Sequence, residues 1–192
     1  MFGFRVSQIV TMEQFWVFGY GSLMWRPGFA YVASEPARLH GYHRRLCVYS
    51  HVHRGTPDKP GLVLGLDHGG SCHGMAFQVP PAAWSETLIY LRAREQATSV
   101  YLERHKTVRL LNSGRAVQAV TFLVDRAHRQ YAGVLQDEEL ERLVRRGHGV
   151  SGHCIDYVMN TLVHLRDMQI HDPTLERLAL RLGPHAANSN SS

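Results

Sequence analysis

The sequence has no run of eighteen apolar residues, although hydrophobic residues make up 44% of its 192 positions. We therefore predict that it has no membrane-spanning helix and no membrane partner. The N-terminal residues make a poor secretory signal, because polar and charged residues interrupt a short apolar stretch. Only three cysteines occur, Cys47, Cys72 and Cys154, and none belongs to a C-x-x-C pair. We therefore expect a reduced, cytoplasmic setting.

Lysine is nearly absent, with Lys59 and Lys106 as the only two, so the net charge of +5 rests on arginine. The arginines are scattered, and no basic run interleaves with aromatic residues as in nucleic-acid-binding surfaces. We therefore expect no nucleic-acid partner, and the positive charge suits an enzyme for small anions. His51 and His53 would lie on one side of a strand, but no further ligand has metal-site spacing, so no metal is predicted.

The pattern predicts one domain at 15–182, after a loosely ordered lead-in at 1–14 and before a disordered tail at 183–192. Short apolar runs predict strands at 15–18, 39–49, 62–66, 73–79, 108–111 and 117–124. Helices are predicted at 81–97, 137–146, 155–168 and 173–182, with Asp137 as an N-cap. Turn residues at 67–70 and 112–114 predict two hairpins, and Gly41 a bulge. This order favours the α+β class, with a curved, mixed, largely antiparallel sheet that can close into a small β-barrel.

One carboxylate breaks the apolar pattern of the helix predicted at 81–97. Trp84, Leu88 and Leu91 form a stripe on one face, and Glu95 is the next position on it. A carboxylate that leaves water is unfavourable unless it is paired or protonated. Glu95 could pair with an arginine or surface at the helix end, or it could be a general base with a raised pKa in a partly dry pocket.

The segment Gly19–Met24 follows the first predicted strand and contains two glycines. Glycine permits positive φ and a close approach of a ligand to the backbone, and successive N–H groups in such a turn can bind an anion. A dinucleotide-binding turn would need glycine where Met24 stands, and a nucleophile elbow around Ser22 would need glycine at positions 20 and 24. A bare Gly-x-Gly-Ser is more often a simple turn, so its alternative role, binding a carboxylate or an oxyanion, needs a second feature.

Five segments in order resemble the ChaC-like γ-glutamylcyclotransferases. They are Trp16–Phe29, Arg38–Arg45, His53–Leu62, Tyr90–Glu95 and Ser151–His153, with Tyr157 downstream. The resemblance therefore covers roughly residues 15–170. The family usually has asparagine after the Ser-Gly-His segment, where this sequence has Cys154.

The resemblance implies a small mixed β-barrel with flanking helices and an enzyme that converts glutathione to 5-oxoproline and cysteinylglycine without a cofactor. It implies that Glu95 is the catalytic acid and base. In the family the γ-glutamyl group is bound by a loop that matches Tyr20, Gly21, Ser22 and Leu23. The flanking Gly19 and Met24 are further candidates for binding it. Arg54 and Tyr157 are candidates for supporting roles. The loop 54–61 is either an ordinary connection or a lid, in which Arg54 and Lys59 could meet the glycine carboxylate of the substrate.

Two alternatives stay open at this stage. The chain could act on other γ-glutamyl compounds, or it could be a regulatory binding module that uses the same pocket without catalysis. A non-catalytic relative would have little reason to keep a carboxylate on an apolar stripe, so Glu95 favours an enzyme. A small-molecule pocket needs no partner subunit, and a monomer is expected.

Overall fold

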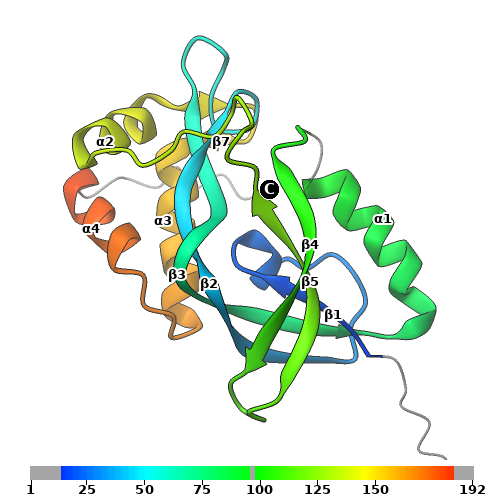
Figure 1. The fold of residues 1–192 in the computed structure, drawn as a ribbon. Coiled ribbons are helices and arrows are strands. Elements are labelled where there is room, and N and C mark those ends of the chain that lie inside the picture. The colour runs from blue at the N-terminus through cyan, green and yellow to red at the C-terminus, as the bar shows by residue number, and fades with distance from the viewer. Residues whose placement is uncertain (1–13, 96–97, 184–192) are drawn as a thin grey trace, which may run out of the picture.

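The computed structural model describes residues 14–95 and 98–183 (Figure 1). The predicted lead-in and tail therefore lie outside the described residues, except for positions 14 and 183. The five long strands form one closed barrel in the order β1-β3-β2-β4-β5. Their bounds are β1 Phe15–Gly19, β2 Ala33–Ser50, β3 Gly61–Val79, β4 Tyr101–Leu110 and β5 Ala116–Val124.

The barrel is mixed, as predicted. β1 pairs with β3, β3 with β2, β2 with β4 and β4 with β5, all antiparallel, and the parallel pairing of β1 with β5 closes the ring. Each strand therefore pairs with two neighbours, although β2 and β4 pair over three residues only. The predicted α+β barrel is confirmed.

The helices cover two sides of the barrel. A 3₁₀ turn at Pro81–Ala83 leads into α1 Trp84–Glu95, which lies alone on one side, whereas the other three helices gather on the opposite side (Figure 1). These are α2 Asp137–Arg146, α3 Cys154–Asp167 and α4 Pro173–Leu182. Two short strands, β6 His148–Gly149 and β7 Gly152–His153, pair with each other before α3. In the described part of the chain, no helix is long and apolar enough to cross a membrane.

Several local predictions are wrong. Residues 67–70 do not turn a hairpin: they lie inside β3, which pairs along its whole length with β2, while 51–60 form the connection. The two glycines there accommodate an extra residue opposite Gly41, whose predicted bulge is confirmed by a register shift between His40 and Tyr42. β4 begins at Tyr101 rather than 108, and Gln136, not Asp137, occupies the N-cap of α2.

Packing of α1 fixes the direction in which its last turn points. Leu91 is fully buried and packs in one cluster with Val17, Val120 and Phe122 of the barrel. Trp84, further back on the same stripe, stacks on Phe15 with ring centroids 4.8 Å apart. The predicted apolar stripe therefore does face the barrel, and it carries the end of α1 toward the barrel's interior.

Candidate active site

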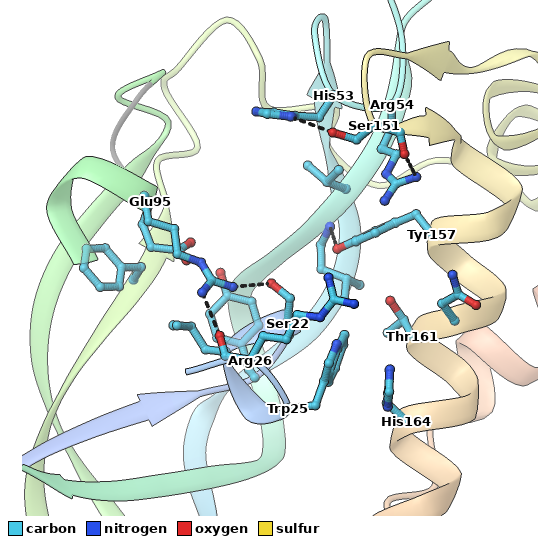
Figure 2. A pocket seen from close by; sticks show the side chains of 18 of the residues that line it. Ser22, Trp25, Arg26, His53, Arg54, Glu95, Ser151, Tyr157, Thr161 and His164 are labelled. Carbon is cyan, nitrogen blue, oxygen red and sulfur yellow. Dashed lines mark hydrogen bonds and ion pairs between the residues drawn. The ribbon is translucent and has the colours of Figure 1, made fainter. Parts of the chain in front are cut away.

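A cavity of about 450 Å³ opens between the end of α1 and one face of α3. Its walls come from the loop after β1, the β2–β3 hairpin, the C-terminal end of α1 and the face of α3 that carries Tyr157, Thr161 and His164 (Figure 2). A volume of this size suits a small-molecule ligand. Most of the residues that the sequence predicted to form the site line this cavity.

Glu95 lies in the wall of this cavity, and its side chain is 18% exposed. Burial raises the pKa of the Glu95 carboxyl above its usual range, and the neighbouring Arg94 guanidinium partly opposes that shift. The Nε atom of Arg94 is 3.2 Å from Oε1 of Glu95. The arginine partner and the raised pKa, which the sequence offered as alternatives, therefore occur together.

Arg94 connects Glu95 to the loop after β1. Its Nη2 donates to Ser22 Oγ at 2.8 Å, and its Nη1 donates to the carbonyl of Arg26 at 2.7 Å (Figure 2). The same Nη1 also donates to the Tyr90 hydroxyl at 2.8 Å. One guanidinium thus fixes Ser22 and Glu95 on the same side of the cavity. Sequence reasoning missed Arg94, although its spacing of four from Tyr90 places the two on one helix face.

The predicted binding loop divides into residues that face the cavity and residues that support it. Tyr20, Gly21, Ser22 and Leu23 line the cavity, and the 3₁₀ turn Ser22–Met24 begins there. The other two predicted residues, Gly19 and Met24, do not line it. Gly19 packs closely against the loop, because a Cβ atom there would lie 3.0 Å from Leu23 Cβ. Neither Gly19 nor Gly21 has a positive φ, so this loop does not use the left-handed backbone that glycine permits.

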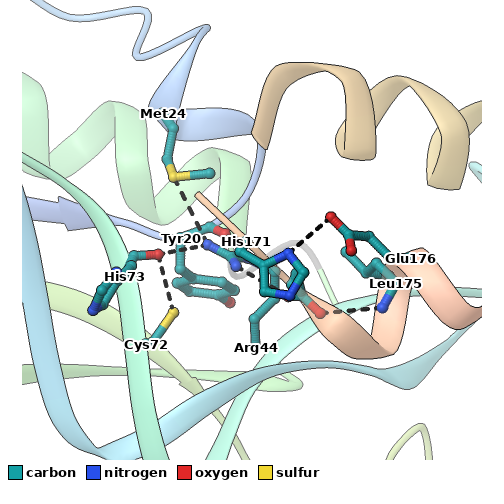
Figure 3. Close-up of polar contacts among 9 residues, drawn as sticks. Tyr20, Met24, Arg44, Cys72, His73, His171, Leu175 and Glu176 are labelled. Atoms are coloured by element: carbon teal, nitrogen blue, oxygen red, sulfur yellow. Dashed lines mark hydrogen bonds and ion pairs between the residues drawn. The ribbon is translucent and has the colours of Figure 1, made fainter. Parts of the chain in front are cut away.

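A buried arginine holds the loop from behind. Arg44 Nε donates to the carbonyl of Tyr20 at 2.5 Å, Nη2 donates to the carbonyl of His73 at 2.7 Å, and Nη1 pairs with Asp172 at 3.1 Å (Figure 3). Asp172 in turn caps α4 by accepting from Leu175 N. The side chains of Arg44 and Asp172 are 4% and 11% exposed. This network ties the backbone of the binding loop to β3 and α4.

Two tyrosines line the cavity on either side of Leu64 in β3. Tyr157 accepts a hydrogen bond from Leu64 N at 3.2 Å, and Tyr101 donates to Leu64 O at 2.7 Å. Burial raises the pKa of Tyr157 to about 12 and that of Tyr101 well above its usual value. Both phenols therefore stay protonated and add no charge beside Glu95. Tyr101 was missed because the prediction began its strand too late.

Arg54 lies at the rim, where it joins the β2–β3 connection to the turn before α3. Its Nη1 donates to the carbonyls of Ser151 and His153, and its guanidinium lies 5.4 Å from the centre of the Tyr157 ring. The backbone N–H of Ser151 also donates to the carbonyl of His53. Lys59 does not line the cavity. The lid stays a prediction, but its end nearest the cavity is held by these bonds.

The three cysteines are buried, and burial keeps their thiols protonated. Cys154 Sγ donates to Leu62 O at 3.1 Å and accepts from Leu62 N at 3.3 Å. Burial raises the pKa of the Cys154 thiol to about 11 and that of Cys47 to about 12, and a thiol is a weak nucleophile compared with its thiolate. The Cys154 thiol both donates and accepts, as the side-chain amide usual at this position could.

No group of three or more metal-binding side chains occurs among residues 14–95 and 98–183. His51 and His53 do not share a strand face as predicted, because β2 ends at Ser50 and both lie in the following bends. The polar side chains that line the cavity carry carboxylate, guanidinium, hydroxyl, phenol, imidazole and amide groups. Such a set can bind an anionic ligand and transfer a proton.

A family model described as ChaC-like protein matches residues 15–182. The glutathione-specific gamma-glutamylcyclotransferase of Escherichia coli is 32% identical over 163 residues, which cover 85% of this chain and 70% of that relative. Glutathione-specific gamma-glutamylcyclotransferase 1 of Danio rerio is 34% identical over 163 residues, or 82% of each chain. A crystal structure of the yeast cyclotransferase specific to glutathione shares the fold, with a TM-score of 0.79 and 24% identity over 88% of this chain and 95% of its own. The chain belongs to the ChaC-like family.

Proposed function

We propose that the chain is a cofactor-independent enzyme that converts glutathione to 5-oxoproline and cysteinylglycine. One observation carries this proposal: the carboxylate of Glu95 is largely buried and has a raised pKa, and Arg94 bonds both this carboxylate and Ser22. The names of the bacterial and fish relatives support glutathione as the substrate. The three free, buried cysteines are consistent with a reducing, cytoplasmic setting, and we infer a monomer.

The reaction is an internal acyl transfer. The α-amine of the γ-glutamyl group attacks its own γ-carbonyl, a C–N bond closes the five-membered ring, and the amide bond to cysteine breaks. Because the nucleophile is tethered to the electrophile, no covalent enzyme nucleophile is required. The enzyme must bind the substrate in a folded conformation, move one proton and stabilise the charge that develops on the γ-carbonyl oxygen.

Glu95 can make both proton transfers. As a carboxylate it accepts a proton from the attacking amine, and as an acid it returns that proton to the departing nitrogen of cysteine. A free α-amine has a pKa of about 8 and an ordinary glutamate about 4.3, so the raised pKa of Glu95 narrows the gap between them. The Arg94 guanidinium and the N–H groups at the start of the 3₁₀ turn supply positive charge for the substrate's carboxylate or for the oxyanion.

Incubation of the purified protein with glutathione tests the proposal directly. We expect cysteinylglycine and 5-oxoproline to be released in equal amounts and without added metal. The same assay with γ-glutamylalanine measures how strictly glutathione is preferred. A protein that binds glutathione but releases neither product would instead be the regulatory module of the same fold.

The pH dependence of kcat/KM should show the effect of Arg94 on the pKa of Glu95. Arg94 lowers the pKa of Glu95, so its removal in Arg94→Met should raise that pKa further. Because the base must be ionised, kcat/KM falls as the pH drops through the Glu95 pKa. We therefore expect the acid limb of the kcat/KM profile to move to higher pH in this variant.

Arg92→Met is the matched control for this measurement. Arg92 lies on the same helix, but its guanidinium pairs with Glu103 and is 50% exposed. Its replacement should leave the acid limb in place. If the acid limb does not move in Arg94→Met, the group that titrates is not in contact with Arg94. That result would contradict the assignment of Glu95 as the general base.

A further inference from the structure

Thr161 carries a buried hydroxyl with no partner. It lies on α3 one turn after Tyr157, it is 1% exposed, and its Oγ1 makes no hydrogen bond with the described residues. A threonine in a helix often satisfies its hydroxyl by bonding the carbonyl four residues earlier, and Thr161 does not. Since Thr161 lines the cavity, a bound ligand can supply the missing partner.

The guanidinium of Arg26 has no acidic partner among residues 14–95 and 98–183. Its side chain lines the same cavity and is exposed, and its guanidinium forms no ion pair or hydrogen bond with residues 14–95 or 98–183. Its backbone is held, because its carbonyl accepts from Arg94. Arg54 also lines the cavity, but its guanidinium already donates to two backbone carbonyls. Arg26 is therefore the better placed of the two to bind a ligand carboxylate.

The face of α3 has the length that the distal part of the substrate requires. From Tyr157 to His164 it extends about 10 Å, since a helix rises about 1.5 Å per residue. Two residues of extended peptide span about 7 Å. The far end is closed by Trp25, whose ring stacks on His164 with centroids 4.4 Å apart (Figure 2). Glu95 and Ser22 lie on the opposite side of the cavity.

We infer that this face of α3, together with Arg26, forms the subsite for the cysteinylglycine half of the tripeptide. In this subsite Arg26 binds the terminal glycine carboxylate, and the Thr161 hydroxyl bonds a peptide group of the dipeptide that departs. The inference rests on the proposed function. It assigns specificity for a γ-glutamyl tripeptide to residues away from Glu95.

Binding to glutathione and to its C-terminal amide tests the role of Arg26. The measurement is made by calorimetry in the Glu95→Gln protein, so that turnover does not consume the ligand. We expect this protein to bind glutathione about tenfold more tightly than the amide, as a charge-assisted hydrogen bond predicts. Adding Arg26→Gln should remove that preference by weakening glutathione alone. Arg166→Gln, at an exposed position of α3 outside the cavity, should keep it.

The outcomes separate this inference from the proposed function. A tenfold preference that survives Arg26→Gln, or no preference in the first protein, would overturn the subsite and leave the proposed function standing. Failure of the Glu95→Gln protein to bind glutathione at all would overturn the subsite. Failure of the parent protein to release cysteinylglycine would overturn the proposed function.

Thr161→Val replaces the hydroxyl with a methyl group of similar size. Because that hydroxyl is unsatisfied in the free protein, the variant should show no loss in Tm without ligand. Its affinity for both glutathione and the amide should fall several-fold, since both ligands keep the peptide group. Unchanged affinities would overturn the role of Thr161 in binding. If the Tm also fell, the hydroxyl would instead contribute to the stability of the fold.

Discussion

Glu95→Gln should lower kcat for glutathione by at least about 100-fold while the ligand still binds. The amide has nearly the same size as the carboxylate, but it can neither accept a proton from the attacking amine nor return one to the departing nitrogen. Release of cysteinylglycine measures the loss of turnover, and calorimetry with glutathione measures binding. Near-normal turnover in this variant would remove Glu95 from the mechanism.

The same variant has an expected effect on stability that does not depend on substrate. Burial raises the folded-state pKa of Glu95 above that of the unfolded chain, so its contribution to stability is present at low pH and lost as the pH rises through the raised pKa. Glu95→Gln should therefore be more stable than the parent near pH 7. The difference in Tm should shrink as the pH falls toward about 4.3, where the unfolded carboxyl also becomes protonated.

Glu86→Gln is the matched control, because Glu86 lies on the same helix and is exposed. It should change neither turnover nor the pH dependence of Tm. If Glu95→Gln and Glu86→Gln have the same pH dependence of stability, the carboxyl of Glu95 is not held in a dry environment. A loss of turnover would then need another explanation than a tuned proton acceptor.

The position of Glu95 could be predicted because the helical repeat is a local pattern. Trp84, Leu88 and Leu91 indicate which face of α1 is buried, and the next residue on that face follows directly. The partner that the loop after β1 supplies could not be derived in this way. Arg94 and Ser22 are 72 positions apart, and only closure of the barrel brings them within hydrogen-bonding distance.

Residues 67–70 illustrate the opposite case, in which a local pattern misleads. Glycines after an aspartate favour a tight turn when only neighbouring residues are considered. In the fold, β2 runs alongside this segment and pairs with residues on both sides of it, so β3 continues and the extra residue becomes a bulge. The aspartate expected at an exposed turn, Asp67, is fully buried instead.

Asp67 is the residue for which we expect the largest loss of stability. Its Oδ1 accepts from Arg126 Nε and from His68 N, and its Oδ2 accepts from the Tyr131 hydroxyl at 2.9 Å and from Arg45 at 3.5 Å. Burial alone would raise the pKa of Asp67, but these hydrogen bonds and charges lower it below its usual value. The carboxylate therefore joins β3 to the segment after β5, because Arg126 and Tyr131 belong to that segment.

Asp67→Asn should reduce the free energy of unfolding by about 2–4 kcal/mol at neutral pH. The side-chain amide keeps the shape but turns an N–H toward groups that donate. The expected loss is smaller than for a fully enclosed ion pair, because Arg126 and Arg45 are 48% and 29% exposed and can return to water. Urea unfolding followed by circular dichroism measures it, with Asp58→Asn in the exposed 51–60 connection as the control.

The pH dependence distinguishes loss of the charge from a simple packing defect. A carboxyl whose folded-state pKa is lowered stabilises the protein above its unfolded pKa of about 3.9, and that contribution is lost as the pH falls through the folded value. The difference between the parent and Asp67→Asn should therefore be largest above about pH 5 and narrow as the solution becomes more acidic. A difference that stays constant down to pH 2 would mean that packing, rather than the ionised carboxylate, holds β3 to the segment after β5.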